Sequence, residues 1–187
     1  MLAAFAFAKL PIRGKEFLFW LLMAALTLPE VVLITPLFVT ATRTNIYNTY
    51  WAVVLPLAAL QIPFTILISR TFVQNLPDEL LEAARIDGAS TFRAFIHVIL
   101  PITRPIAAVI VVLTLIGAWN SYLLPLVFLQ SVDNQVVTQV PSFFQGQYND
   151  DQPKVLASAV ITAIPEVLAY VLLQKWFERG IAAGALK

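Results

Sequence analysis

The sequence predicts an all-α fold, a polytopic membrane helical bundle with four full spans, the end of a fifth, and a short hairpin on the cytoplasmic side. Of the 187 residues, 59% are hydrophobic and only 12% are charged. An ordinary soluble domain carries about 25% charged residues, so the composition places the chain among membrane proteins. The apolar residues run continuously rather than alternating, which favours spanning helices over strands.

Four apolar segments are each long enough to cross a bilayer core about 30 Å thick, which needs roughly 20 residues of helix. These segments are 17–40, 50–69, 105–130 and 155–174. Their charged residues are Glu30 and Glu166. Prolines in the segments are expected to kink the helices. Their presence either reflects the ordinary frequency of proline in membrane spans or serves a gating movement. They are Pro29, Pro36, Pro56, Pro63, Pro125 and Pro165.

The first eight residues, MLAAFAFA, are apolar but too short to span a membrane. A signal peptide would need a basic start before the apolar run, and none is present. We interpret the segment as the cytoplasmic end of a helix whose earlier part is missing. The chain would then be a truncated form that lacks the first one to two spans.

The distribution of basic residues predicts the orientation, because short cytoplasmic loops carry an excess of Lys and Arg. Ten of the twelve basic residues fall on one side of the predicted spans, and only Arg43 and Lys154 fall on the other. We therefore expect residues 70–104 and the C-terminal tail to be cytoplasmic. Residues 41–49 and 131–154 would face outward.

Residues 77–97 are predicted to form two short helices that meet at a glycine. Pro77 suits a first helical position, and Gly88 after Asp87 is typical of a helix end. Ser90 is expected to cap the second helix. There Phe92, Phe95, Ile96 and Ile99 share one apolar face, and Pro101 and Pro105 would stop the helix.

The hairpin either lies on lipid headgroups or docks to a protein. Surface helices of membranes usually have a basic polar face. Between residues 78 and 104 there are four acids and three arginines, which favours a protein partner.

The predicted outer loop, 131–154, is long for a connection between helices and carries Phe143, Phe144 and Tyr148. It is either a binding segment or a solvated connector with a few buried rings.

Several classes of site are excluded or disfavoured. The chain has no cysteine and a single histidine, His97, which excludes thiolate and multi-histidine metal sites, and we predict no metal site. Its net charge of +1 does not point to nucleic acid. It has no G-x-x-x-x-G-K-[ST] phosphate-binding loop.

The hairpin resembles a known signature. Glu82-Ala83-Ala84, three residues, Gly88, nine residues, Val98, one residue and Leu100-Pro101 resembles the EAA motif of ABC importer permease subunits, with Val98 in place of the usual isoleucine. The longer form, LPDELLEAARIDGAS, is similar to that of maltose-type inner-membrane permeases, the carbohydrate branch of that family. The stretches AFAFAKLPIRGK, ITPLFV, WNSYLLPLVFL and RGIAAGALK agree with it.

The resemblance implies a non-catalytic permease subunit in a bacterial or archaeal cytoplasmic membrane. Two partner ATPase subunits would bind ATP and Mg, and no cofactor would bind to this chain. A second permease subunit and an extracellular or periplasmic solute-binding protein would complete the importer, with no nucleic acid involved. Residues 77–97 would be the coupling helices, and the residues that meet the ATPase would be Glu82, Ala83, Ala84, Asp87, Gly88, Phe92, Phe95 and Ile96.

Five polar or aromatic residues in the spans are candidates for a sugar path. Trp119 and Asn120 combine a ring that stacks on sugars with an amide that hydrogen-bonds them. Gln61, Glu30 and Glu166 are further candidates, because a polar group inside a bilayer is energetically costly and is therefore first considered as part of a functional site. Trp119 could also be an interfacial anchor, and each acid could be a buried group that never meets substrate.

Two other classes of protein remain as alternatives. An ion-coupled secondary transporter would use Glu30 and Glu166 to carry protons. A membrane enzyme would need convergent catalytic groups, and the spans contain no paired carboxylates at helical spacing. The sequence does not identify the sugar.

Overall fold

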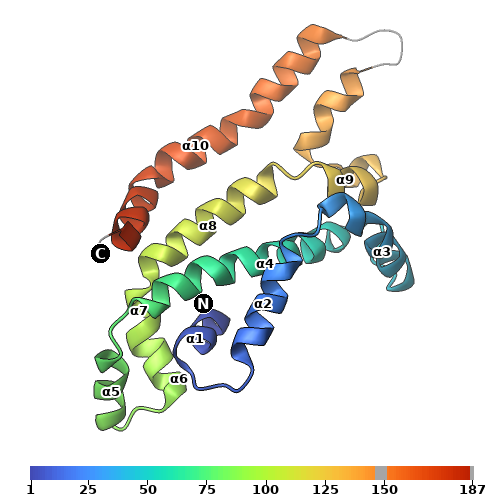
Figure 1. Ribbon diagram of the computed structural model, residues 1–187. Helices are drawn as coiled ribbons and strands as arrows, with labels where there is room; N and C mark the ends of the chain where they lie inside the picture. The colour runs from blue at the N-terminus through green and yellow to red at the C-terminus, as the bar shows by residue number, and fades with distance from the viewer. Residues whose placement is uncertain (146–150, 186–187) are drawn as a thin grey trace. The chain divides into compact units, whose positions relative to one another are not determined.

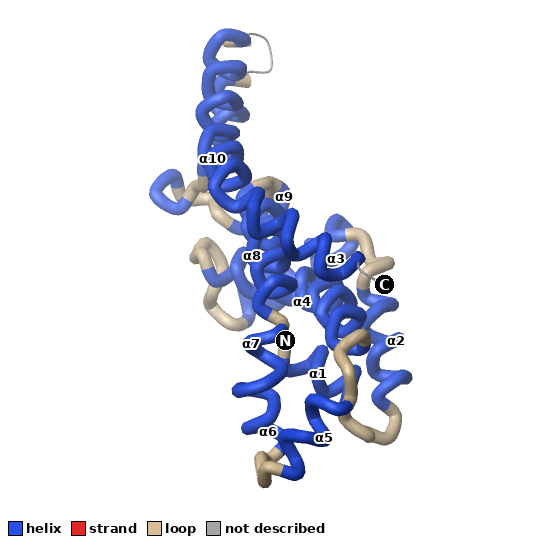
Figure 2. The backbone as a smooth tube through the Cα atoms, turned by 90° about the vertical axis from the view of Figure 1, so that its left-hand side faces the viewer, coloured by secondary structure: helices blue, strands red, loops and turns tan. Residues whose placement is uncertain are grey.

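The computed structural model describes residues 1–145 and 151–185, and every regular element within them is helical (Figures 1 and 2). The prediction of an all-α fold is confirmed. Tyr148 and Lys187, which the sequence analysis uses, lie outside the described residues. The elements are α1 (Leu2–Lys9), α2 (Lys15–Ala25), α3 (Glu30–Arg43), α4 (Trp51–Gln74), α5 (Glu79–Ile86), α6 (Thr91–Ala94), η1 (Phe95–Ile99), α7 (Leu100–Ile102), α8 (Arg104–Trp119), α9 (Leu123–Phe128), η2 (Val132–Asn134), η3 (Val137–Phe144) and α10 (Gln152–Ala185).

Two of the described helices are by themselves long and apolar enough to cross a membrane. They are α4 and the Gln152–Leu172 part of α10. The number rises to four if each of two bent pairs is a single span: α2 with α3, and Thr91–Ile102 with α8. The described helices thus supply two to four candidate spans, and the number of four full spans stays a prediction.

The predicted span 17–40 is broken between α2 and α3. Pro29 precedes α3 in an extended conformation, with φ −64° and ψ 137°. A proline disfavours helical geometry at the residue before it, here Leu28, and has no N–H for the helical ladder. The kink that was expected at Pro29 is therefore a full break between α2 and α3. Pro36 and Pro165, by contrast, lie inside α3 and α10.

The predicted span 105–130 also ends early. Helix α8 stops at Trp119, and α9 begins four residues later at Leu123. The backbone N–H and the side-chain Nδ2 of Asn120 both donate to the Ile116 carbonyl in the last turn of α8, at 3.0 and 3.1 Å. No proline lies at this break, so proline spacing alone could not predict it.

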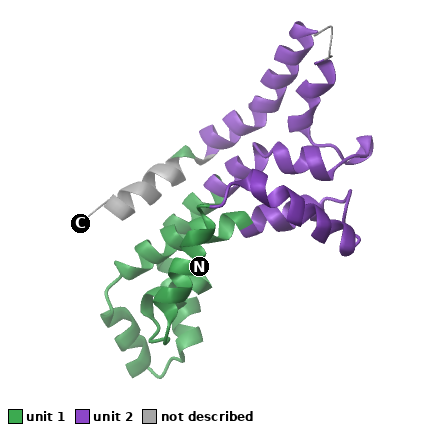
Figure 3. Cartoon of the chain, turned by 45° about the vertical axis from the view of Figure 1, so that its right-hand side comes forward, with its two compact units in different colours: residues 1–27, 60–112, 174–187 green, residues 28–59, 113–173 purple. Residues whose placement is uncertain are grey.

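The chain forms two compact units, which Figure 3 colours separately. Unit 1 comprises residues 1–27, 60–112 and 174–187, and unit 2 comprises residues 28–59 and 113–173. The assignment of residues 1–187 to one membrane domain stays a prediction.

The core of unit 1 lies where α1, the end of α4, α5 and the α6–η1 helix meet. Its buried members are Phe5, Val73, Leu81, Ala84, Ala94, Phe95 and Ile99. The core of unit 2 includes Leu124 and Phe128, one turn apart on α9, and Leu129, which directly follows the helix; all three are at most 1% exposed. Phe38 of α3 packs on Phe128, with ring centroids 6.4 Å apart.

Candidate functional site

The elbow, which we define as residues 77–97, turns at Gly88. Helix α5 ends at Ile86, and Gly88 has a φ of +78°. The Ala89 N–H donates to the Ala84 carbonyl at 2.9 Å, and the Gly88 N–H donates to the Arg85 carbonyl at 3.0 Å. This is a Schellman ending, which requires the left-handed conformation that glycine adopts without strain. The predicted turn at Asp87-Gly88 is confirmed.

The second arm begins at Ser90, as predicted. The Ser90 Oγ accepts a hydrogen bond from the Arg93 N–H at 3.3 Å, and Ser90 itself is extended with ψ 158°. The side chain thereby satisfies one of the free N–H groups of the first turn.

The second arm ends at Ile102, between Pro101 and Pro105, so the predicted stop before the next span is confirmed. The chain stays helical to Ile102, and Thr91–Ile102 makes an angle of 73° with α8. Residues Phe95–Ile99 form a π-helical turn, in which the Leu100 N–H reaches the Phe95 carbonyl. Pro101 cannot donate to the His97 carbonyl and would collide with it in an α-helix. The wider π turn just before Pro101 relieves that conflict.

One side of the elbow is part of the unit 1 core. Leu81 and Ala84 of α5 are each 7% exposed, and Phe95 of the second arm is also 7% exposed. The Phe95 ring lies 5.3 Å from that of Phe5, measured between centroids. Of the predicted ATPase contacts, Ala84 and Phe95 therefore hold the elbow to the unit.

The other side of the elbow is exposed and partly apolar. Ile86 is 86% exposed, Phe92 is 62% exposed and Ile96 is 38% exposed. Glu82, Ala83, Asp87 and Gly88 are exposed as well. The predicted apolar face thus divides in two: Phe95 and Ile99 are buried, whereas Phe92 and Ile96 are available to a partner. Exposed apolar side chains of this size are candidates for contact with a partner.

A groove of 580 Å³ runs between the two arms of the elbow. Small and apolar side chains line it, including Leu80, Ala83, Ala89 and Val98. Charged groups of both signs, among them Asp87 and Arg93, lie around it. The small residues let a partner approach closely, and the charges favour a protein surface over an anionic membrane.

Three of the five candidate path residues meet in unit 2. The Trp119 Nε1 donates to the Thr162 carbonyl of α10 at 3.0 Å, and the Asn120 Nδ2 donates to the Glu166 Oε1 at 2.8 Å. The end of α8 is thus attached to α10 by an indole and an amide. Glu166 thus accepts a hydrogen bond from a neutral amide.

The other two candidates are not brought to this cluster by any contact that the structure gives. Glu30 begins α3, and its Oε1 is buried with no hydrogen-bond partner among the described residues. Gln61 lies on the part of α4 that belongs to unit 1 and is half-buried. An apolar pocket of 260 Å³ in unit 2 has Trp119 in its wall, together with Tyr50, Leu57 and Pro125.

Asn48 anchors the start of the predicted outer loop, and sequence reasoning missed it. Its Oδ1 accepts from the Gln130 and Ser131 N–H groups at 2.9 and 3.0 Å. Its Nδ2 donates to the Ser131 Oγ at 2.5 Å, and its own carbonyl accepts from the Asn134 Nδ2 at 2.7 Å. Asn48 has a φ of +58°, a conformation that asparagine tolerates better than most residues.

Beyond Asn134 the outer loop is attached to the segment between α8 and α9. The Thr138 hydroxyl donates to the Ser121 carbonyl at 2.9 Å, and Gln139 is 2% exposed. Phe143 is 56% exposed, so an aromatic ring is available at the surface. At the far end Lys154 pairs with Asp151 at 2.6 Å, and this hydrogen bond lowers the pKa of the Asp151 carboxyl.

The described residues contain no group of three or more His, Asp or Glu side chains that could hold a metal ion. The candidate sites are therefore a docking surface on the elbow and a polar cluster at the end of α8.

A family model described as "Binding-protein-dependent transport system inner membrane component" matches residues 1–183. The chain is 34% identical over 185 residues to the probable ABC transporter permease protein YurM of Bacillus subtilis, covering 99% of this chain and 62% of that protein. It is 32% identical to the arabinooligosaccharides transport system permease protein AraQ of Halalkalibacterium halodurans, covering 100% and 66%. It is 36% identical to the sn-glycerol-3-phosphate transport system permease protein UgpE of Yersinia enterocolitica, covering 97% and 64%.

The fold also resembles a solved structure, a bacterial ABC transporter involved in the import of the acidic polysaccharide alginate. The TM-score is 0.75 at 20% identity, over 93% of this chain and 66% of that one. The chain spans roughly three-fifths to two-thirds of the length of the curated relatives named above.

Proposed function

We propose that this chain, which belongs to the family of binding-protein-dependent transport system inner membrane components, is the permease subunit of an ATP-driven importer. Its cargo would be a sugar or a related polyol or oligosaccharide. The relatives support this class, because their names include permeases for arabinooligosaccharides, for diacetylchitobiose, and for melibiose, raffinose and stachyose.

The single observation that carries the proposal is the two-sided elbow. Its inner side, with Leu81, Ala84 and Phe95, is packed into the core of unit 1. Its outer side presents Ile86, Phe92 and Glu82 to a partner. A partner that grips the outer side would move the core-packed side with it. An ATP-binding subunit is the partner that the family supplies, and ATP and Mg would bind there.

The remaining partners follow from the same proposal. Two ATP-binding subunits would act on two permease subunits, and a solute-binding protein would meet residues 131–154. The chain would cross the cytoplasmic membrane several times, with the elbow and the C-terminus on the cytoplasmic side. Trp119, Asn120 and Glu166 would lie on the sugar path, because together they offer a ring, an amide and a carboxylate.

The test is recovery of an ATP-binding subunit with this chain after co-expression from the same gene neighbourhood. Glu82→Lys reverses a charge on the docking side, and Gly88→Val disfavours the left-handed turn; both are expected to lose the partner. Gly14→Val is the matched control. Gly14 has a φ of +76°, and an added Cβ at either glycine meets nothing within 4 Å. Gly14→Val therefore carries the same backbone strain outside the elbow.

Normal recovery of the partner by both elbow variants would contradict the docking role. An uptake assay in membrane vesicles then distinguishes an ATP-driven importer from an ion-coupled transporter. An importer of the proposed kind loses uptake when ATP is removed. Uptake that persists without ATP and collapses with the ion gradient would instead indicate ion coupling.

A further inference from the structure

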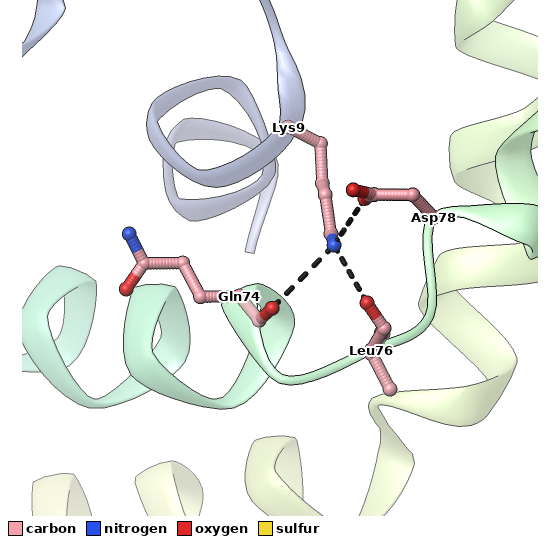
Figure 4. Close-up of polar contacts among 4 residues, drawn as sticks. All are labelled: Lys9, Gln74, Leu76 and Asp78. Carbon is pink, nitrogen blue, oxygen red and sulfur yellow. Dashed lines mark hydrogen bonds and ion pairs between the residues drawn. The ribbon is translucent and has the colours of Figure 1, made fainter.

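The ammonium group of Lys9 is enclosed where α4 gives way to the elbow (Figure 4). Its Nζ donates to the Asp78 Oδ1 at 2.6 Å, to the Leu76 carbonyl at 2.6 Å and to the Gln74 carbonyl at 3.5 Å. The Lys9 side chain is only 7% exposed, whereas the Asp78 side chain is 76% exposed. A nearly buried lysine therefore uses its three protons on three acceptors.

The acceptors explain why a lysine fits this position. The carbonyls at the end of a helix have no partner within it, and the helix dipole makes that end negative. Gln74 is the last residue of α4, Leu76 lies in the linker, and Asp78 immediately precedes α5. One ammonium thus joins the end of α4, the linker and the start of the elbow to α1.

A second cation binds the same end of α4 to α2. The Arg70 Nη2 donates to the Glu16 Oε1 at 2.5 Å, and the Arg70 guanidinium carbon lies 3.9 Å from the centre of the Phe19 ring. Arg70 is 8% exposed. The last turns of α4 are therefore attached to α1 through Lys9 and to α2 through Arg70.

We propose that Lys9 is a positioning residue that makes the elbow and α4 move as one body. The inference rests on the proposed function, in which a motor subunit displaces the elbow. Between Gln74 and Glu79 lie only four residues, and a displacement of α5 could be absorbed by bending them. The apolar contacts of Leu81 and Ala84 have no fixed direction and permit sliding. The directional, charge-assisted bonds of Lys9 resist it, because each has to break before the linker bends.

The test measures whether α5 moves relative to α4 during the ATP cycle. The chain contains no cysteine, so single cysteines can be introduced as the only labelling sites. Spin labels at Thr71→Cys on α4 and Glu79→Cys on α5 replace exposed side chains. Their separation is measured by electron paramagnetic resonance in the lipid-reconstituted complex, without nucleotide and after trapping with ATP, Mg and vanadate. In the otherwise unaltered chain, the mean separation and its width are expected to stay the same in the two states.

Lys9→Met keeps the length of the side chain and removes the charge. We expect the label separation to change or broaden on trapping. Amide hydrogen exchange at residues 76–82 should also rise about tenfold, since the charge-assisted bonds of a nearly buried lysine are lost. Lys9→Arg, which restores the charge, should return both readouts toward the unaltered chain. Lys15→Met is the matched control, because the Lys15 Nζ donates only to the Leu10 carbonyl, at 2.9 Å, among the described residues.

The outcomes separate the inference from the proposed function. If Lys9→Met retains the ATP-binding subunit and its label separation stays constant on trapping, the inference is overturned while the function stands. If the unaltered chain recruits no ATP-binding subunit, the function fails and the inference fails with it. Should Lys9→Met not assemble, Asp78→Asn removes only the exposed carboxylate charge and is expected to raise exchange at residues 76–82 by a smaller factor. Unchanged exchange in Asp78→Asn would then count against the inference.

Discussion

The two units of the molecule hold their connecting segments with different chemistry. In unit 1 the linker before the elbow is held by the Lys9 ammonium, and the end of α4 is held to α2 by the Arg70–Glu16 pair. In unit 2 the start of the outer loop is held by the neutral amide of Asn48, and α8 is attached to α10 by Trp119 and Asn120.

The difference fits the roles that we propose for the two regions. A cation at a helix end forms several strong bonds to a region that must transmit force. An asparagine in the left-handed conformation fixes the direction of a chain without adding charge. A neutral anchor suits a segment that presents a surface to a partner protein. The comparison therefore predicts that the elbow is sensitive to the loss of a charge, and that the outer loop is sensitive to a change in backbone conformation at its anchor.

The largest expected effect on stability comes from a substitution in the hydrophobic core of unit 1. Phe95→Ala removes a buried ring that packs on Phe5, and such substitutions typically cost about 3–5 kcal/mol of unfolding free energy. Thermal unfolding in detergent measures the loss. Phe143→Ala in unit 2 removes a ring that is 56% exposed and is expected to change stability by less than about 0.5 kcal/mol. Equal losses from the two variants would contradict the assignment of Phe95 to the core.

Much of the elbow could be predicted from the sequence, because its signals are local. The glycine of a Schellman ending and the serine of an N-cap act within four or five residues of themselves. The division of the apolar face could not be predicted in this way. Helical spacing places Phe92, Phe95, Ile96 and Ile99 together, but only packing against α1 and α4 decides which of them are buried.

The contacts that join the helices were invisible to sequence reasoning. Lys9 and Asp78 are 69 residues apart, Glu16 and Arg70 are 54 apart, and Asn48 and Ser131 are 83 apart. No periodicity connects such positions. The ends of the spans were predicted poorly for a related reason: length and hydropathy do not say where a helix stops, and the break after Trp119 has no proline to mark it.

Replacement of the Arg70 side chain should have the next largest effect on stability. Arg70→Met eliminates the bond to Glu16 and the cation–π contact with Phe19 while keeping an apolar stem. We expect a loss of about 2–3 kcal/mol in unfolding free energy, a range typical of a hydrogen bond between charged groups. Glu16 is 55% exposed and can be solvated when its partner is lost, which keeps the cost at this level. Glu16→Gln is the matched control and should cost less, because the cation–π contact survives. An equal loss from Glu16→Gln would show that the contact with Phe19 contributes little.

Asn48 offers a test of the neutral anchor in unit 2. Asn48→Gly removes the side-chain bonds to Gln130 and Ser131 and keeps the positive φ accessible. Amide exchange at residues 130–134 should rise by a factor equivalent to about 1–2 kcal/mol. Asn48→Ala loses the same bonds and must also hold a φ of +58°, which adds about 1 kcal/mol. If alanine and glycine are equivalent, the backbone conformation of Asn48 does not matter to the outer loop.

Salt should produce the smallest effect and distinguishes the two anchors most directly. Raising the ionic strength from 0.1 to 1 M shortens the Debye length from about 10 Å to about 3 Å. The Asp78 side chain is 76% exposed, so its attraction to Lys9 is partly screened, whereas the bond from Lys9 to the Leu76 carbonyl is partly buried. Because Asp78 is exposed, its electrostatic attraction to Lys9 contributes less than about 1 kcal/mol to stability. Amide exchange at residues 76–82 is therefore expected to rise by less than about fivefold in high salt, and exchange at residues 130–134 should not change. An equal response at both places would remove the chemical distinction between the two anchors, since the Asn48 amide offers salt no charge to screen.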